Sequence, residues 1–266
     1  MTESVFESDV VRIDKQGKVA WLVLNRPGQI NAVNDAVRRD VPRALALLDA
    51  NPDVGVIVIR GEGPRGFCAG ADVKETRNPE SSAEVRKRME RTRWIEGPEN
   101  TIKPVIAAIH GACMGGGMEL ALACDIRIAS PDAKFALPEV DLGLIPGGGG
   151  TQRIGRLIGT GRALDLILSA DRLTAQAAYD IGLITRLAAS SETLLDETFA
   201  LAQRIAAKPP LALAAAKRAV RRAFDLELQA GLAMELDMFA HLAPTNDRQE
   251  AARAFIEKRT AVFHGR

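Results

Sequence analysis

Aromatic side chains are scarce in this sequence, and an excess of either charge sign is absent. Phe, Trp and Tyr make up 4% of the 266 residues and hydrophobic residues make up 47%, so a large core must be aliphatic. The 35 Lys and Arg residues nearly match the 34 Asp and Glu residues, which gives a formal net charge of +1. This balance argues against a general binder of nucleic acids or membrane surfaces.

Membrane-spanning and targeting signals are also lacking. No apolar run reaches the roughly 18 residues that a membrane helix needs. The first ten residues, MTESVFESDV, are acidic and lack the charged and then apolar pattern of a secretory signal peptide. We therefore expect a soluble, cytoplasmic protein with no membrane partner.

Cysteine and histidine are too few and too scattered to suggest a metal site. The three cysteines, Cys68, Cys113 and Cys124, have no CxxC spacing and lie in apolar or glycine-rich settings. The three histidines lie far apart along the chain. We expect packed, reduced thiols, which suit a cytosolic compartment, and no metal ligands.

Short β-rich runs alternate with helical patterns over the first part of the chain. Four runs are typical of strands: Val19 to Asn25, Val54 to Arg60, Val105 to Ile109 and Asp125 to Ala129. Asn34 to Ala50 carries apolar residues at helical spacing. The alternation predicts an α/β architecture in which the apolar strands are covered on both faces.

The pattern changes at about residue 190, where strands give way to helices. Four helical segments follow: Thr193 to Ala207, Pro210 to Phe224, Leu226 to Ala240 and Asp247 to Lys258. We therefore divide the chain into an α/β body, residues 1–190, and a helical region, residues 191–266. From composition alone, this region is either an oligomerisation element or a terminal packing layer.

The segment HGACMGGGMELALACD places three glycines, Gly115 to Gly117, directly before an apolar helix. The first N–H groups of a helix have no partner inside it, and the helix dipole adds positive charge there. This start is therefore a candidate cradle for an anion or oxyanion, although close helix packing would also explain the glycines. FCAGAD, residues 67–72, is a second small-residue loop that follows a buried strand.

Two acids lie in apolar settings near these loops. Glu119 lies in the first turn of the apolar helix, and Glu139 follows a proline in FALPEVDLGLIPGGGGTQ. Each is either a structural acid or a catalytic group whose pKa is tuned by burial. Twenty residues separate them, so spacing alone does not show that they meet. The basic segment Glu84 to Trp94 is either a solvated helix face or a patch that steers an anionic ligand.

Three blocks occur in order: FCAGADVKE, KPVIAAIHGACMGGGMELALACD and FALPEVDLGLIPGGGGTQR. Together they resemble the crotonase superfamily, and within it the enoyl-CoA hydratases. The flanking segments LNRPGQINAVN and EAARAFIEKRTAVFHGR are similar to the family's early loop and closing helix, so the resemblance covers essentially the whole chain.

The resemblance implies a crotonase-like spiral of ββα turns in residues 1–190 and a helical trimerisation region in residues 191–266. It implies a homotrimer, or a homohexamer built as a dimer of trimers. It also implies an acyl-coenzyme A thioester as substrate, with no metal and no cofactor apart from the coenzyme A that is part of the substrate.

The resemblance also assigns residues to roles. The N–H groups of Ala71 and Gly116 would hold the thioester oxygen, Glu119 would activate water, and Glu139 would donate a proton to Cα. Trp94 and Met118 are candidate walls of the acyl pocket. Lys74 is a plausible phosphate contact or an ordinary surface lysine. The residues expected to bind substrate are Ala69, Gly70, Ala71, Asp72, Val73, Lys74 and Gly116.

The expected reaction is hydration of the 2,3 double bond of an enoyl-CoA. An isomerase, or a dehydratase of a specialised hydroxyacyl-CoA such as carnitinyl-CoA, would use the same scaffold. Isomerases commonly retain only an acid like Glu139, so the presence of Glu119 favours the hydratase. A relative that binds RNA is a further alternative, favoured only by the basic segment and opposed by the charge balance, so we expect no nucleic-acid partner.

Overall fold

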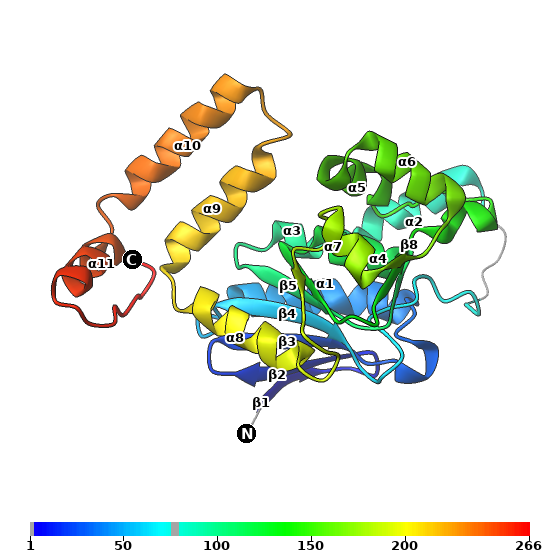
Figure 1. The fold of residues 1–266 in the computed structure, drawn as a ribbon, viewed down its shortest axis with the longest axis horizontal. Coiled ribbons are helices and arrows are strands. Elements are labelled where there is room, and N and C mark those ends of the chain that lie inside the picture. Colours follow the sequence, from blue (N-terminus) through cyan, green and yellow to red (C-terminus); the bar gives the residue numbers. More distant parts are fainter. Residues whose placement is uncertain (1–2, 76–79) are drawn as a thin grey trace.

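The computed structural model describes residues 3–75 and 80–266, and a mixed sheet lies at its centre (Figure 1). Seven strands run in the order β1, β2, β3, β4, β5, β7, β10. The pairs β1–β2 and β2–β3 are antiparallel, and the later pairs are parallel. The bounds are β1 (Glu3–Glu7), β2 (Val11–Gln16), β3 (Val19–Leu24), β4 (Val56–Gly61), β5 (Val105–Ile109), β7 (Ile126–Ala129) and β10 (Arg186–Leu187).

Both faces of the central strands are covered, which explains their near-continuous apolar sequences. Successive side chains on a strand point to opposite faces. Leu22 of β3 therefore joins the core under α1 (Asp35–Ala50), while its neighbour Trp21 joins a second cluster under α8 (Leu194–Ala206). The central strands are thus covered by helices on both faces.

A second, smaller sheet leads into helix α4 (Gly116–Ala123). In it, β8 (Lys134–Ala136) lies between β6 (Ala112–Met114) and β9 (Leu173–Thr174). The other helices of the body are α2 (Ser82–Thr92), α3 (Gly97–Asn100), α5 (Gly150–Ile158), α6 (Thr160–Ser169) and α7 (Ala175–Asp180), with 3-10 turns η1 (Pro27–Gln29), η2 (Trp94–Glu96) and η3 (Pro138–Leu142).

The last three helices form an arm that extends from the body (Figure 1). In this arm α9 (Pro210–Arg222) packs beside α10 (Leu228–Leu242), and neither helix contributes a residue to the hydrophobic core clusters. α11 (Asn246–Ile256) lies at the end of the chain, where the Asp247 carboxylate accepts the N–H groups of His264 and Gly265. α8 differs from the arm because it packs on the sheet.

Ionic contacts fasten α9 to the body at Asp125, just after α4. Lys217 Nζ lies 2.9 Å from Asp125 Oδ2, and Arg221 Nη2 lies 2.7 Å from Asp125 Oδ1. The Lys217 side chain is almost fully buried, and Nζ also donates to the carbonyl oxygens of Pro98 and Lys103, each at 2.8 Å. Asp125 therefore neutralises a buried ammonium group at the root of the arm.

The four predicted strands are confirmed as β3, β4, β5 and β7, each within two residues of its expected bounds. The helix after the first strand is confirmed as α1, and the four C-terminal helices as α8 to α11. The three cysteines are free and buried, as expected, and burial raises the pKa of Cys68 to about 12. Within the described residues, no helix is both long and apolar enough to span a bilayer.

Removal of the negative charge at the root of the arm tests the anchoring contacts. We expect Asp125→Asn to lower the free energy of unfolding by about 3 kcal/mol, because Lys217 is left buried without its anion. Urea unfolding followed by circular dichroism measures the change. Asp53→Asn is the control, since Asp53 is 77% exposed and 3.8 Å from Lys15, and we expect little effect there. Equal losses from the two substitutions would contradict the anchoring role.

Candidate active site

Two glycine-rich loops meet at the start of α4. The backbone of Cys68, in the first loop, forms an isolated β-bridge with that of Cys113 in β6. The Met114 N–H donates to the Cys68 carbonyl oxygen at 2.9 Å. A Cβ on Gly117 would lie 2.4 Å from that same carbonyl oxygen. Glycine is therefore required at position 117 for the first loop to lie against the helix.

The helix start leaves N–H groups available on both loops. Gly115, with φ of 50° and ψ of −126°, turns the chain into α4 in a conformation that favours glycine. A Cβ on Gly70 would lie 3.5 Å from the Gly116 nitrogen, so the loops run close together. Among the described residues, the N–H groups of Ala71 and Gly116 donate to no backbone carbonyl. The predicted pair of amides therefore lies on adjacent loops, with Ala71 exposed and Gly116 half-buried.

Glu119 is 4% exposed and is held by the loop that precedes α5. Its Oε1 accepts the N–H groups of Gly148 at 2.7 Å and Gly150 at 2.8 Å. Burial raises the pKa of Glu119 above its ordinary value of 4.5, while these two N–H groups and the charge of Arg153 oppose the rise. The carboxylate is thus desolvated and held in one orientation.

Glu139, in η3, lies against the same helix start. A Cβ on Gly115 would lie 3.0 Å from Glu139 Oε1, and Oε2 is buried with no hydrogen-bond partner among the described residues. Burial raises the pKa of Glu139, and the negative charge of Glu119 raises it further. The fold therefore brings the two acids within electrostatic reach, and one buried oxygen is left for a ligand or water.

The loop expected to bind substrate is fastened to the N-terminal side of α1. Val33 donates its N–H to Gly70 at 2.8 Å and accepts the N–H of Asp72 at 3.0 Å. The Asp72 carboxylate pairs with Arg26 at 2.8 Å, a contact that lowers its pKa. Ala69 is half-buried, whereas Val73 and Lys74 are exposed. Asp72 thus holds the loop in place, and Lys74 is open to an anionic ligand.

The glycines of the run Gly147 to Gly150 lie close against neighbouring side chains. A Cβ on Gly148 would lie 2.0 Å from Ile95 Cδ1 and 2.7 Å from Glu119 Oε2, and one on Gly149 would lie 2.1 Å from Arg153 Nη1. The glycine run is visible in the sequence, but nothing in the sequence singles out Arg153. No spacing rule connects Arg153 to Glu119, which lies on another helix.

The residues named as pocket walls differ in their surroundings. Trp94 in η2 lies beside Gly116, whose Cβ would be 3.7 Å from the indole Cζ2. Met118 is fully buried in the main core. Trp94 belongs to the same core and is 7% exposed, so its indole ring lies at the edge of that core beside the helix start, while Met118 lies within it.

The basic segment up to Thr92 lies in α2, which has no buried residue, and the segment ends at the buried Trp94 of η2. Ser81 and Glu84 cap its first turn, and Arg86 and Arg88 pair with Glu90 and Glu80 at 2.9 and 2.8 Å. These local pairs are typical of a solvated helix face. Across the described ranges, no group of three or more His, Cys, Asp or Glu residues is arranged to hold a metal ion.

Comparison with known proteins places this geometry in a family. The sequence model described as enoyl-CoA hydratase/isomerase matches residues 14–266. The chain belongs to the enoyl-CoA hydratase/isomerase family. It is 40% identical over 254 residues to the 2,3-dehydroadipyl-CoA hydratase of Escherichia coli, with 96% of this chain and 98% of the relative covered. It is 39% identical over 255 residues to the crotonyl-CoA hydratase of Syntrophomonas wolfei, with 94% and 96% covered.

A solved structure of this family has the same fold. The enoyl-CoA hydratase from Bacillus anthracis superposes with a TM-score of 0.91 at 37% sequence identity, covering 97% of this chain and 100% of that one. The crotonase-like α/β body and the helical C-terminal region expected from the sequence are therefore confirmed.

The buried carboxylate of Glu119 makes stability depend on pH. The pKa of Glu119 is higher in the folded state than in the unfolded state, so its ionisation lowers the free energy of unfolding. This loss develops as pH rises from the unfolded-state pKa through the folded-state pKa, and it amounts to about 1.4 kcal/mol for each pH unit between the two pKa values. In Glu119→Gln an amide oxygen can still accept the Gly148 and Gly150 N–H groups. We therefore expect this variant to gain stability relative to the wild type between pH 4 and pH 8.

Urea unfolding of both proteins at several pH values measures that difference. A difference that stays constant with pH, or that shrinks as pH rises, would show that the folded pKa of Glu119 is not raised. The corresponding Glu62→Gln variant is a control, because the pKa of Glu62 is lowered and its contribution to stability has the opposite pH dependence.

Proposed function

We propose that this protein is an enoyl-CoA hydratase, which adds water across the 2,3 double bond of an enoyl-CoA thioester. The observation that carries the proposal is the meeting of two desolvated acids, Glu119 and Glu139, at a glycine-rich helix start. Family membership, together with full-length relatives named as hydratases of CoA thioesters, supports this substrate class.

Negative charge on the thioester oxygen is stabilised by two amides. As the water oxygen bonds to Cβ, the π electrons of the double bond move toward Cα and the thioester carbonyl, which gives an enolate. The N–H groups of Ala71 and Gly116 donate to that oxygen, next to the positive end of the α4 dipole. Removal of one such donor typically costs about 3 kcal/mol of transition-state stabilisation.

The two acids divide the proton transfers. Glu119 accepts a proton from the attacking water, and Glu139 donates a proton to Cα as the enolate collapses to the 3-hydroxyacyl thioester. Two N–H groups and Arg153 favour the ionised form of Glu119, whereas Glu139 faces the negative charge of Glu119 and has one oxygen without a donor. These surroundings suit Glu119 as the base and Glu139 as the acid. After turnover the proton that Glu119 took from water passes to Glu139, which restores the starting state of both acids.

The remainder of the thioester follows the loop of residues 69–74. Its exposed Lys74 attracts the phosphates of coenzyme A, and Trp94 borders the acyl group. Coenzyme A enters as part of the substrate, and the proposed proton and charge transfers use only groups of this chain.

An isomerase of the same family is the second candidate, because the family description covers both reactions. Moving a double bond requires proton transfer at carbon but no attacking water. The second carboxylate, Glu119, adds a group for activating water, and this favours hydration.

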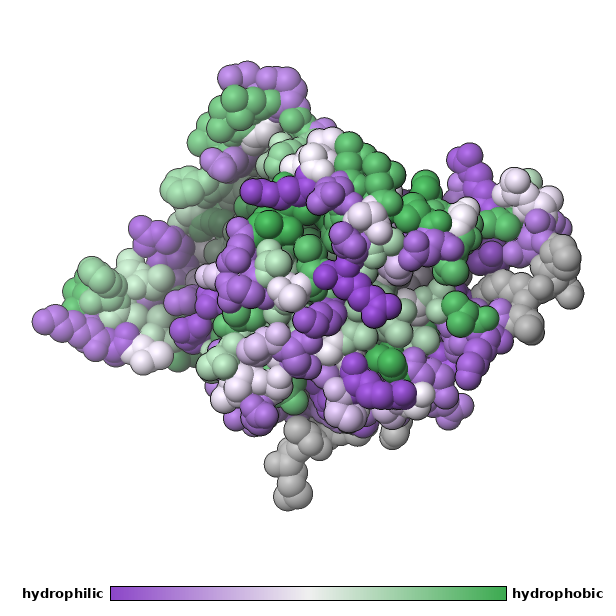
Figure 2. All heavy atoms as spheres, turned by 45° about the vertical axis from the view of Figure 1, so that its right-hand side comes forward, coloured by the Kyte–Doolittle hydropathy of each residue, from purple (hydrophilic) through white to green (hydrophobic). Residues whose placement is uncertain are grey.

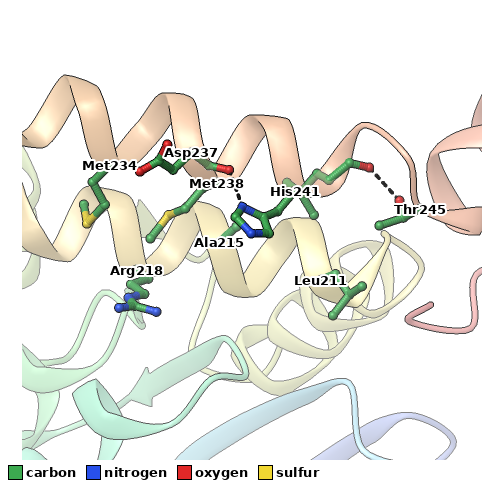
Figure 3. Close-up of a pocket in the computed structure, with 9 residues that line it drawn as sticks. Leu211, Ala215, Arg218, Met234, Asp237, Met238, His241 and Thr245 are labelled. Atoms are coloured by element: carbon green, nitrogen blue, oxygen red, sulfur yellow. Dashed lines mark hydrogen bonds between the residues drawn. The ribbon is translucent and has the colours of Figure 1, made fainter.

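The arm is proposed to assemble the protein into a trimer or a dimer of trimers, as part of the helical region 191–266. Exposed apolar side chains extend along it, among them Val220, Phe224, Leu232, Leu236 and Phe239. Figure 2 shows hydrophobic residues on the arm and on the nearby body, and Figure 3 shows an apolar groove between α9 and α10 that includes Leu211, Met234 and Met238. An apolar surface of this extent is typical of a protein interface.

Substitution of each acid tests the reaction. We expect Glu119→Gln and Glu139→Gln each to lower kcat for hydration of crotonyl-CoA by at least about 100-fold, because each removes one proton-transfer group from a site that keeps its shape. Loss of the enoyl absorbance measures turnover, and circular dichroism checks the fold. Near-normal hydration by either variant would refute the paired roles. Conversion of a 3-enoyl-CoA by a wild type unable to hydrate crotonyl-CoA would favour the isomerase.

A charge placed on the arm tests assembly. We expect Leu236→Glu to lower the molar mass measured by light scattering, because Leu236 is exposed on α10 and would face an apolar partner surface. Leu47→Glu makes the same change on α1 of the body and should leave the mass unaltered. A monomeric wild type, or an arm variant with unchanged mass, would reject this role.

A further inference from the structure

A network of charged side chains lies behind the loop that holds Glu119. Arg153 Nη1 donates to the Gly148 carbonyl oxygen at 2.6 Å. The Nε and Nη2 atoms of Arg153 donate to the two carboxylate oxygens of Glu99, each at 2.6 Å. Glu99 Oε1 also accepts Arg221 Nη1, from α9 of the arm, at 3.0 Å.

Gly148 is therefore held from two sides. Its N–H donates to Glu119 Oε1, and its carbonyl oxygen accepts Arg153 Nη1. The next residue, Gly149, has φ of 98° and leaves space for the guanidinium group. The position of Arg153 thus determines where the loop presents its N–H groups to Glu119.

The pair of Arg153 with Glu99 has the geometry of a rigid support. Two parallel N–H···O bonds from a planar guanidinium group fix orientation as well as distance. The side chains are 15% and 26% exposed, so water competes less than it does at an open surface pair. Lysine could keep the charge at position 153 but could not bond both Gly148 and Glu99 in this fork.

The network also reaches the other end of α4. Arg221 Nη2 donates to the carbonyl oxygen of Ala123, the last residue of α4, at 2.6 Å and to Asp125 at 2.7 Å. The same arginine therefore contacts the helix that carries Glu119 and, through Glu99 and Arg153, the loop that orients it.

We propose that Glu99 and Arg153 are positioning residues for Glu119, and that Arg221 couples this arrangement to the arm. Arg153 holds Gly148 so that two N–H groups converge on Oε1 of Glu119. Glu99 fixes Arg153, and α9 fixes Glu99. The catalytic consequence rests on the proposed hydratase function, whereas the orientation of the loop does not.

Glu99→Gln is the primary test, since it weakens the bonds to Arg153 and Arg221 without changing side-chain volume. We expect kcat for crotonyl-CoA hydration to fall about tenfold, with KM changed less than about twofold, because the misplaced acid is needed in the transition state. Hydrogen exchange at the Gly148 and Gly150 amides should become faster, as measured by mass spectrometry of fragments that contain them.

Glu62→Gln is the matched control. Glu62 also joins two arginines, Arg12 and Arg60, with contacts of 3.0 Å, and its side chain is 31% exposed. It lies outside the proposed site, so kcat and the exchange of residues 148–150 should stay at the wild-type values. Equal behaviour of the two variants would overturn the positioning role.

Arg153 variants separate charge from geometry. The charged groups that face Glu119 or its partner Arg153 are Glu139, Glu99 and Glu96. Arg153→Gln removes a charge that lowers the pKa of Glu119, so the acid limb of kcat/KM should move to higher pH. Arg153→Lys should show a smaller shift but still a reduced kcat. Full activity of Arg153→Lys would reject the need for the fork.

The two measurements distinguish the possible failures. A wild type that does not hydrate enoyl-CoA would refute the proposed function, and the exchange rates would then decide the positioning role alone. An active wild type with unchanged kcat and exchange in Glu99→Gln would refute only the positioning role. If Glu99→Gln does not fold, Arg153→Lys provides the same comparison of exchange and kcat.

Discussion

Desolvation of the Glu119 carboxylate is the constraint on which the arrangement around α4 depends. An ionised acid inside a protein is costly unless donors replace the water that it loses. Gly148 and Gly150 supply two such donors, and at each position a Cβ would lie 3.0 Å or less from a Glu119 carboxylate oxygen. Two glycines of the run thus accommodate the Glu119 carboxylate, while Gly149 accommodates Arg153.

The same constraint gives the two acids different surroundings. Glu119 receives hydrogen bonds and faces a cation, while Glu139 has a buried oxygen without a donor and faces an anion. Acid–base catalysis requires one group that accepts a proton and another that donates one, and unequal surroundings produce that difference from two identical side chains. The nearby loops add amides that can stabilise charge on a carbonyl oxygen.

The arm and the site are joined through a few charged side chains. Asp125 accepts Lys217 and Arg221, and Arg221 also reaches Glu99. Apolar side chains such as Phe224, Leu236 and Phe239 are exposed on the arm, while Arg221 at its root contacts Glu99. The proposed assembly and the proposed catalysis would therefore both depend on helix α9, through different residues.

Much of the fold follows from local sequence. Local sequence is sufficient to predict two sets of elements, because strand and helix periods act over neighbouring residues. These are the apolar strands β3, β4, β5 and β7 and the periodic helices α1 and α8 to α11. The short strands of the second sheet cannot be predicted in this way, since a run of two or three residues carries no period. The glycine loops, both acids and their order were equally visible, and with them the family.

Only the tertiary structure decided which groups meet. Sequence alone could not show that Glu139 lies against Gly115, that α8 covers the sheet while α9 leaves it, or that Arg153 and Glu99 support Glu119. These contacts join segments separated by tens of residues, and their geometry comes from the way the helices pack on the sheets. Local chemistry therefore determined the elements and the reactive groups, and long-range packing determined their partners.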